Sequence, residues 1–344
     1  MKNENLHKAK ATKNDEFYTR LEDIEKELEH YTEHFKGKVA YCNCDDANRS
    51  NFFKYFSINF QKLGLKKLIT SGLKIDCTED GTDGTDGTEN GTGIVAIQKG
   101  NDIDIYDGNG DFRSEECIEF LKEADIVVTN PPFSLFREYV AQLMQYGKKF
   151  LIIGNNNAIT YKEIFPYIKE GKLWLGRTLF TGKMPYFKVS DKYPIENERF
   201  EKREDGLYKQ VNSVCWFTNL TNTSNKEELI AIRTYNPTEY PKYENYDAIE
   251  VGRMENFPMD YDGVCGIPIT GLKYLWDDGT IHIEINGASN QFEIIWQASG
   301  NTKASAPKDI LAKLNYKPHK DDRGGCTIVN GKRTYGRILI QKII

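Results

Sequence analysis

The first part of the chain alternates between apolar segments with helical spacing and short, continuous apolar runs. Residues 23–35 place Ile24, Leu28 and Phe35 on one helical face, and residues 51–63 repeat that spacing with several phenylalanines. The short runs are 39–44, 67–71, 94–98, 103–106, 126–129 and 150–154. Helices that alternate with buried strands predict an α/β fold with a doubly wound, mostly parallel sheet.

A proline-rich turn closes the run at 126–129, and it reads Asn130-Pro131-Pro132-Phe133. Two consecutive prolines cannot continue a strand, so the chain must turn sharply at this edge of the sheet. Ligands of open α/β sheets bind outside the carboxyl ends of the strands, so the Asn130 amide and the Pro131 carbonyl would face the ligand. Two acceptors beside an aromatic ring suit a planar, amino-bearing substrate such as adenine. The plainer alternative is a turn without chemistry.

Acidic residues follow two other predicted strands. Asp45 and Asp46 come after the first run, where the ribose or the amino acid part of a cofactor would lie. Asp111 and Phe112 follow the run at 103–106, and the Asp111 carboxylate could accept a hydrogen bond from the amino group of a cofactor's adenine. Each aspartate could instead be an ordinary turn former. Their occurrence together with the proline turn favours a binding role.

Residues 79–93 interrupt this pattern with three tandem Asp-Gly-Thr units. Aspartate and glycine at this density favour turns and bury nothing, so we expect a disordered loop between two strands. The recurring Asp80, Asp83 and Asp86 would allow a calcium site, but their spacing matches neither the twelve-residue calcium loop nor the nine-residue β-roll repeat. We therefore predict no metal site.

The pattern changes after a predicted helix at 161–168 and a strand at 172–176. Beyond about residue 177, aromatic, glycine and charged residues mix without long periodicity. Short strands are predicted at 213–217, 230–233, 281–285 and 292–296. We therefore expect three parts, which are a flexible basic arm (1–14), a core that carries the candidate site (15–176) and a mixed α/β region (177–344).

The chain of 344 residues has a net charge of −5, so it lacks the overall basic excess of many nucleic-acid-binding proteins. Both ends are nevertheless locally basic, and contact with phosphates needs only a local patch. The candidate residues are Lys8, Lys10, Lys13, Arg323, Lys332, Arg333 and Arg337. They could equally be ordinary solvated charges.

Hydropathy and cysteine usage bear on the compartment. No apolar stretch is long enough for a membrane span or has the character of an N-terminal signal. The seven cysteines are scattered without metal-site spacing and are interpreted as reduced thiols. We expect a cytoplasmic protein.

Four stretches resemble the EcoRI-type modification methylases, a family of adenine-specific DNA methyltransferases. They are 15–19 (DEFYT), 41–46 (YCNCDD), 50–56 (SNFFKYF) and 125–134 (DIVVTNPPFS). The resemblance runs from about residue 7 to about residue 175, and more loosely to the C-terminus. As in that family, Cys-Asn-Cys-Asp-Asp stands where most methyltransferases carry a Phe-x-Gly-x-Gly loop.

The resemblance implies an S-adenosylmethionine-dependent methyltransferase fold and methyl transfer from that cofactor to N6 of adenine in double-stranded DNA. Hydrogen bonds from the amino group to the Asn130 oxygen and the Pro131 carbonyl would favour a pyramidal nitrogen that can attack the methyl group, without a covalent intermediate. The target base must leave the helix to reach the pocket, where Phe133 would stack on it. The residues implied in catalysis are Asn130, Pro131, Pro132 and Phe133. Those implied in cofactor binding are Tyr18, Thr19, Cys42, Asn43, Asp45, Asp46, Asp111, Phe112 and Asn130.

The resemblance also implies partners. Region 177–344 and the arm would recognise a GAATTC-like site, with the basic residues named above more suited to phosphates than to bases. The enzyme would act as a monomer and as the modification half of a restriction-modification system, beside a cognate endonuclease.

Two other functions stay open. Asn-Pro-Pro-Phe also occurs in enzymes that methylate RNA bases, and Asn-Pro-Pro-Tyr in enzymes that methylate a glutamine amide, although the EcoRI-like stretches argue against both. A catalytically silent DNA-binding protein on the same scaffold would not require an intact Asn130 and Phe133. A metal-dependent nuclease would need clustered carboxylates near a lysine, which the sequence does not offer outside its acidic repeat.

Overall fold

The computed structural model describes residues 19–73, 93–178, 186–189, 200–203, 206–210, 214–221, 228–299, 307–322 and 324–343. The chain divides into two compact units, and neither is a single stretch of sequence. The first unit comprises 1–155 and 178–220, and the second comprises 156–177 and 221–344. The chain therefore crosses between the units more than once, whereas the sequence predicts one boundary at residue 177.

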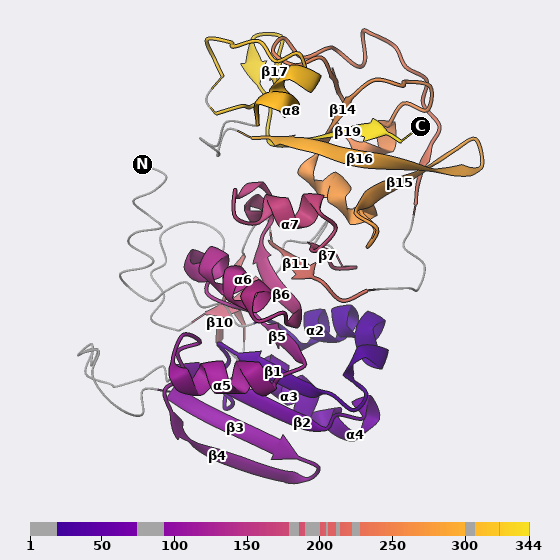
Figure 1. Ribbon diagram of the computed structural model, residues 1–344. Coiled ribbons are helices and arrows are strands. Elements are labelled where there is room, and N and C mark those ends of the chain that lie inside the picture. Colours follow the sequence, from indigo (N-terminus) through magenta and orange to yellow (C-terminus); the bar gives the residue numbers. More distant parts are fainter. Residues whose placement is uncertain are drawn as a thin grey trace. The chain divides into compact units, whose positions relative to one another are not determined.

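The first unit is built on a mixed sheet (Figure 1). Its strands lie in the order β4 (Asp102–Gly108), β3 (Gly93–Lys99), β2 (Lys67–Leu73), β1 (Val39–Asn43), β5 (Ile126–Thr129), β6 (Lys149–Asn155) and β11 (Val214–Thr218). The α/β class is confirmed, and β2, β1, β5 and β6 are parallel as predicted. The strands that flank them, β3 and β11, run antiparallel, and so does β4 beside β3. One cause is the tight turn at Gly100 (φ +63°), which joins β3 to β4 and leaves no room for a crossover.

Helices cover both faces of the parallel strands. One face packs against α2 (Leu21–Leu28), the 3-10 helix Glu29–Phe35, α3 (Asn51–Ile58) and α4 (Phe60–Leu63). The other face carries α5 (Glu115–Glu123) and α6 (Phe136–Gln145). The alternation of a strand is visible in β1, where Cys42 joins the cluster around α3, whereas the Tyr41 ring meets Phe120 of α5 at 6.1 Å between centroids.

The strand predicted at 213–217 lies in the first unit and not in the C-terminal region. It forms β11, which pairs with β6 from Val214 opposite Asn155 to Thr218 opposite Leu151. Trp216 is fully buried there. The same unit holds a small antiparallel sheet of β8 (Tyr186–Val189), β10 (Gly206–Gln210) and β9 (Phe200–Arg203).

The second unit is rich in strands. Its main sheet has the order β12 (Leu229–Ala231), β15 (Thr280–Ile285), β16 (Ala288–Ala298), β19 (Arg337–Lys342), β14 (Cys265–Pro268) and β13 (Ile249–Glu250). β17 (Ile328–Val329) and β18 (Lys332–Arg333) form a separate hairpin. The remaining elements are β7 (Trp174–Leu175), α7 (Phe165–Lys169), α8 (Lys308–Lys313) and the 3-10 helices Asn156–Thr160, Met254–Asn256 and Ile269–Tyr274. The second unit is therefore mixed α/β, although residues 178–220, which the sequence analysis assigns to the same region, belong to the first unit.

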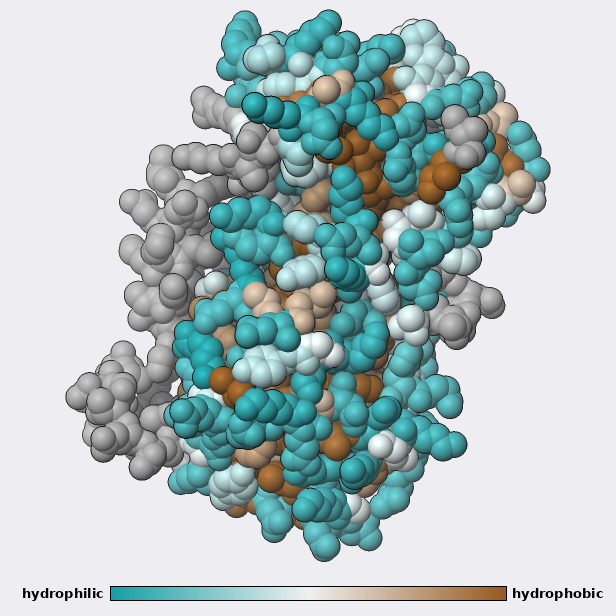
Figure 2. All heavy atoms as spheres, in the orientation of Figure 1, coloured by the Kyte–Doolittle hydropathy of each residue, from teal (hydrophilic) through white to brown (hydrophobic). Residues whose placement is uncertain are grey.

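The hydropathy of the sequence predicts that no segment spans a membrane. None of the helices in the part of the chain that the structure describes combines the length and apolar character that crossing a bilayer needs. The face in Figure 2 is largely hydrophilic, with apolar side chains in scattered groups. The described cysteines are all free thiols.

Candidate active site

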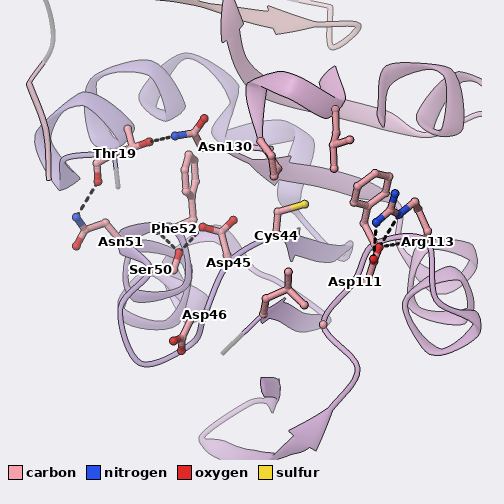
Figure 3. Close-up of a pocket in the computed structure, with 15 residues that line it drawn as sticks. Thr19, Cys44, Asp45, Asp46, Ser50, Asn51, Phe52, Asp111, Arg113 and Asn130 are labelled. Atoms are coloured by element: carbon pink, nitrogen blue, oxygen red, sulfur yellow. Dashed lines mark hydrogen bonds and ion pairs between the residues drawn. The ribbon is translucent and has the colours of Figure 1, made fainter. Parts of the chain in front are cut away.

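A pocket lies at the carboxyl ends of β1 and β5 in the first unit (Figure 3). These parallel strands are neighbours in the sheet, so the turns that follow them reach the same place. The lining residues are Thr19, Cys44, Asp45, Asp46, Ser50, Asn51, Phe52, Leu73, Gly110, Asp111, Phe112, Arg113, Asn130, Pro132 and Leu135. The polar segments that follow three different strands thus converge on one pocket.

The two neighbouring aspartates have different surroundings. Asp45 is 9 % exposed, and its Oδ1 accepts a hydrogen bond from the Ser50 hydroxyl at 2.8 Å while its Oδ2 accepts one from the Thr129 hydroxyl. Asp46 is half-buried, and its Oδ1 accepts a hydrogen bond from the backbone N–H of Asn48 at 2.8 Å. Asp45 is therefore held between α3 and β5, whereas Asp46 presents a carboxylate to the pocket.

Glycines of neighbouring strands bring the backbone close to this turn. A Cβ atom on Gly72 of β2 would lie 2.5 Å from the carbonyl carbon of Asp45 and 2.6 Å from the nitrogen of Asp46. Gly110, with φ +74°, approaches the Gly72 carbonyl equally closely from the segment after β4. Only glycine permits such contacts. The turn after β1 therefore packs directly against the main chain of Gly72, although the turn contains no glycine itself.

An ion pair and an aromatic ring form another wall. The Asp111 carboxylate accepts hydrogen bonds from Arg113 Nε at 2.9 Å and Nη2 at 2.7 Å, and these bonds lower the pKa of Asp111. Phe112 is 4 % exposed, and its ring packs edge-on against Tyr139 at 5.2 Å between centroids. Asp111 thus remains an anion, but Arg113 already occupies two of its acceptor positions.

The proline turn brings Asn130 into the pocket. Pro131 is buried, while Pro132 belongs to the lining. The Asn130 side-chain nitrogen donates to Thr19 Oγ1 at 3.3 Å, and the Thr19 carbonyl oxygen accepts from Asn51 Nδ2 at 2.7 Å (Figure 3). Thr19 therefore connects the asparagine of the turn to the start of α3.

Besides the buried Pro131, three predicted site residues lie outside the pocket lining. Cys42 is fully buried, and burial raises the pKa of its thiol well above its usual value. Asn43 is also fully buried, and its Oδ1 accepts a hydrogen bond from the Tyr139 hydroxyl. Both lie within β1, a strand covered on both faces, so the prediction that they contact a cofactor is replaced by a role in the core. Phe133 packs against the apolar cluster around α3, and its stacking on a base stays a prediction.

Several lining residues are absent from the set predicted from the sequence. Ser50 could have been recognised, because it precedes a helical run and caps α3 by accepting hydrogen bonds from the N–H groups of Phe52 and Phe53. Cys44 adopts a left-handed backbone (φ +65°), for which the sequence gives no signal. The others are Asn51, Phe52, Leu73, Gly110, Arg113 and Leu135. Tyr18, which is predicted to hold the cofactor, lies outside the described residues.

The predicted DNA-contacting residues fall into different environments. Lys332 and Arg333 are exposed on β18. Arg337 is not available for phosphates, since its side chain is only 12 % exposed and its Nε lies 3.0 Å from the Glu250 carboxylate. The prediction for Arg337 is therefore wrong, because a buried ion pair satisfies its charge. Lys8, Lys10, Lys13 and Arg323 lie outside the described residues.

In the part of the chain that the structure describes, no three or more histidine, cysteine, aspartate or glutamate side chains are arranged to hold a metal ion. The aspartates of the tandem repeat, on which the calcium alternative depends, lie outside that part.

Comparison with known proteins places the chain in a family. Residues 5–343 match the family described as adenine-specific methyltransferase EcoRI. The chain is 49 % identical over 285 residues to the Type II methyltransferase M.EcoRI of Escherichia coli. The aligned region covers 78 % of this chain and 85 % of M.EcoRI. The chain is 36 % identical over 345 residues to M.MgeORF184P of Mycoplasma genitalium, and 36 % identical over 347 residues to M.MpnI of Mycoplasma pneumoniae, with 98 % of both chains covered in each case.

No solved structure gives a significant match. The family match nevertheless extends through both units of the structure, and all three relatives carry the name of Type II methyltransferases. The chain therefore belongs to the EcoRI-type family of adenine-specific DNA methyltransferases.

Proposed function

We propose that the pocket at the ends of β1 and β5 binds S-adenosylmethionine together with a flipped adenine, and that the chain methylates N6 of that adenine in double-stranded DNA. Family membership makes it an adenine-specific DNA methyltransferase that requires a methyl donor. The observation that supports the finer proposal is the meeting of Asp46, Phe112 and Asn130 in one pocket. Parallel central strands between two helical layers support a sheet of the S-adenosylmethionine-dependent methyltransferase type.

The lining of the pocket fits this cofactor. Asp46 offers a half-buried carboxylate to ribose hydroxyls, and Phe112 and Leu73 offer apolar contacts to a ring. Arg113 balances the charge of Asp111, so Asp46 supplies the negative character that suits a sulfonium cation. When bound, the cofactor supplies an electrophilic methyl group.

Asn130 and the backbone of the turn act on the acceptor. The lone pair of adenine N6 is delocalised into the ring, which makes the amino group a poor nucleophile. The Asn130 side-chain oxygen and the Pro131 carbonyl are acceptors for its two N–H bonds, and these contacts favour a pyramidal nitrogen with a localised lone pair. Neither acceptor is basic enough to keep a proton, so their contribution is position and polarisation, and the methylated nitrogen releases its proton to water. Cys42 takes no part as a nucleophile, because burial raises the pKa of its thiol and keeps it protonated.

The second unit is the proposed reader of DNA. Its exposed Lys332 and Arg333 suit phosphate contacts, as do the basic residues of the N-terminal arm. Since M.EcoRI is 49 % identical over 285 residues, we propose a GAATTC-like target. We also propose that the chain acts as a monomer in the cytoplasm, as the modification half of a restriction-modification system with a cognate endonuclease.

Sequencing of DNA with detection of modified bases tests this function. The DNA is taken from cells that lack other adenine methylases and that express either the wild type or the Asn130→Ala variant. We expect N6-methyladenine at one short motif with the wild type, and none with the variant. Soluble wild-type protein that binds S-adenosylmethionine but leaves the DNA unmodified would refute the proposal, and methylated RNA in the same cells would identify the RNA alternative.

A further inference from the structure

We propose that Asp45 and Thr129 form a bridge that sets the distance between the two halves of the active site, and that Asp45 is a positioning residue and not a ligand of the cofactor. The proposal rests on the function proposed above, because it takes the turn after β1 as the cofactor side and the turn after β5 as the acceptor side. Both residues belong to the first unit.

The bridge lies where the sheet itself no longer holds the two strands together. Regular pairing between β1 and β5 joins Ala40 to Ile126 and Tyr41 to Val127, and it does not continue to the strand ends. Beyond these paired residues a side chain links the two strands. The single proton of the Thr129 hydroxyl is shared between the Asn43 carbonyl oxygen and Asp45 Oδ2, and both acceptors come after Tyr41, the last residue of β1 that pairs with β5.

The surroundings of Asp45 suit a bridge better than a ligand-binding carboxylate. Both of its oxygens are engaged, Oδ1 by the Ser50 hydroxyl and Oδ2 by the Thr129 hydroxyl, and the residue is only 9 % exposed. Its own backbone is fixed as well, since its N–H donates to the Ser71 carbonyl at 2.9 Å and its carbonyl accepts from the Thr70 hydroxyl at 3.0 Å. Asp45 therefore transmits the position of β2 and α3 to Thr129.

Thr129 immediately precedes Asn130, which contacts the methyl acceptor in the proposed mechanism. A shift of Thr129 would move Asn130 relative to the cofactor turn. Group transfer is steep in the approach of the reacting atoms, and a displacement of about 1 Å can reduce the rate roughly a hundredfold. Loss of the bridge should therefore affect the transfer step and spare cofactor affinity, which we assign to Asp46.

Four variants separate these roles. Asp45→Asn leaves one acceptor oxygen where two hydroxyls donate in the wild type, and Thr129→Val removes the hydroxyl of the bridge, both with little change in shape. Thr129→Ser retains the hydroxyl, and Asp46→Asn alters the proposed ligand. Thr218→Val is the matched control, because Thr218 is a buried threonine of the same unit whose hydroxyl donates to the Phe150 carbonyl at 2.7 Å, away from the pocket lining. Thermal unfolding verifies that each variant is folded.

Two quantities are measured for each variant. Calorimetric titration with S-adenosylhomocysteine, the product that carries no methyl group to transfer, gives the affinity for the cofactor site. Single-turnover methylation of a DNA duplex, with both substrates saturating, gives the rate constant of transfer. We expect Asp45→Asn and Thr129→Val to lower this rate constant by about ten- to a hundredfold. Their affinity for S-adenosylhomocysteine should stay within about twofold of the wild type, in line with an intact Asp46.

The remaining expectations follow from the bridge. The double variant should be no slower than the slower single variant, because both changes break the same contact. Thr129→Ser and Thr218→Val should transfer at the wild-type rate, and Asp46→Asn should lose affinity and keep its rate constant at saturation. If Asp45→Asn fails to fold, Thr129→Val and Thr129→Ser still decide the question.

Opposite outcomes overturn the proposal. Weaker binding of S-adenosylhomocysteine to Asp45→Asn with an unchanged rate at saturation would make Asp45 a ligand. Additive losses in the double variant would show that the two residues act separately. A wild-type enzyme that binds S-adenosylhomocysteine but does not methylate DNA would instead refute the proposed function, and this assignment with it.

Discussion

The substitution Gly72→Ala should damage the cofactor side of the site without touching a functional side chain. The added Cβ would lie 2.5 Å from the Asp45 carbonyl carbon, 2.6 Å from the Asp46 nitrogen and 2.8 Å from the Asp45 oxygen. All three are backbone atoms, so no side chain can rotate away. Ordinary contact between carbon atoms needs about 3.5 Å, so the turn after β1 has to withdraw by about 1 Å.

The turn cannot withdraw freely, because two hydrogen bonds fix it to β2. The Asp45 N–H donates to the Ser71 carbonyl at 2.9 Å, and the Thr70 hydroxyl donates to the Asp45 carbonyl at 3.0 Å. An added methyl group in a close-packed site costs about 1–3 kcal/mol of unfolding free energy. The same displacement moves Asp46, so we expect affinity for S-adenosylmethionine to fall by at least about tenfold, which corresponds to about 1.4 kcal/mol.

Urea unfolding followed by tryptophan fluorescence measures the stability, and calorimetric titration measures the cofactor affinity. Gly252→Ala is the matched control, because its Cβ would meet only a Glu250 side-chain oxygen, at 3.9 Å. A Gly72→Ala variant with the stability of this control and the affinity of the wild type would refute the close approach of the two backbones.

Four further results are expected. Thr19→Val should slow methyl transfer about fivefold, because it removes one hydrogen bond to Asn130, whereas Thr19→Ser should keep the wild-type rate. Equal transfer rates for Thr19→Val and Thr19→Ser would contradict a role for this contact. Arg337→Ala should destabilise the second unit by about 3–5 kcal/mol, measured by urea unfolding, because it leaves the buried Glu250 carboxylate without its cation. Arg333→Ala should instead lower DNA affinity and reduce its salt dependence by about one phosphate contact, measured by binding titrations at several salt concentrations. The lowered pKa of Asp111 means that its contribution to stability is present above the unfolded pKa of about 3.9 and is lost as the pH falls through the folded value, so acid unfolding of Arg113→Gln should begin at higher pH than that of the wild type.

Local sequence patterns are sufficient to find most of the candidate site. Asp46, Phe112 and Asn130 each follow an apolar run, and the rule that ligands bind at the carboxyl ends of parallel strands brings them together. The apolar pattern around Cys42 indicates instead that its side chain is buried. A continuous apolar run predicts a strand buried on both faces, so no side chain within it is free to meet a ligand.

Contacts between distant parts of the chain are not predictable in this way. β11 pairs with β6 about sixty residues earlier, and no local pattern distinguishes that strand from the β-rich segments around it. A charged side chain such as Arg337 is expected at the surface when only its neighbours in sequence are considered. Its ion-pair partner Glu250 is 87 residues away in the sequence, so the burial of the pair is not predictable from the local pattern. The backbone contact of Gly72 with Asp45 likewise depends on the register between β1 and β2.

The interleaving of the two units has a practical consequence for dissecting the enzyme. A fragment that ends at residue 176, as the sequence alone suggests, would lack β11 and would leave β6 as an exposed strand edge with Ile152 and Ile153 beside it. Such edges recruit other chains, so this fragment should aggregate. No single cleavage point separates the units. Autonomous halves would require a circularly permuted gene, or a shortened chain in which a linker replaces 156–177 and the sequence continues to residue 220.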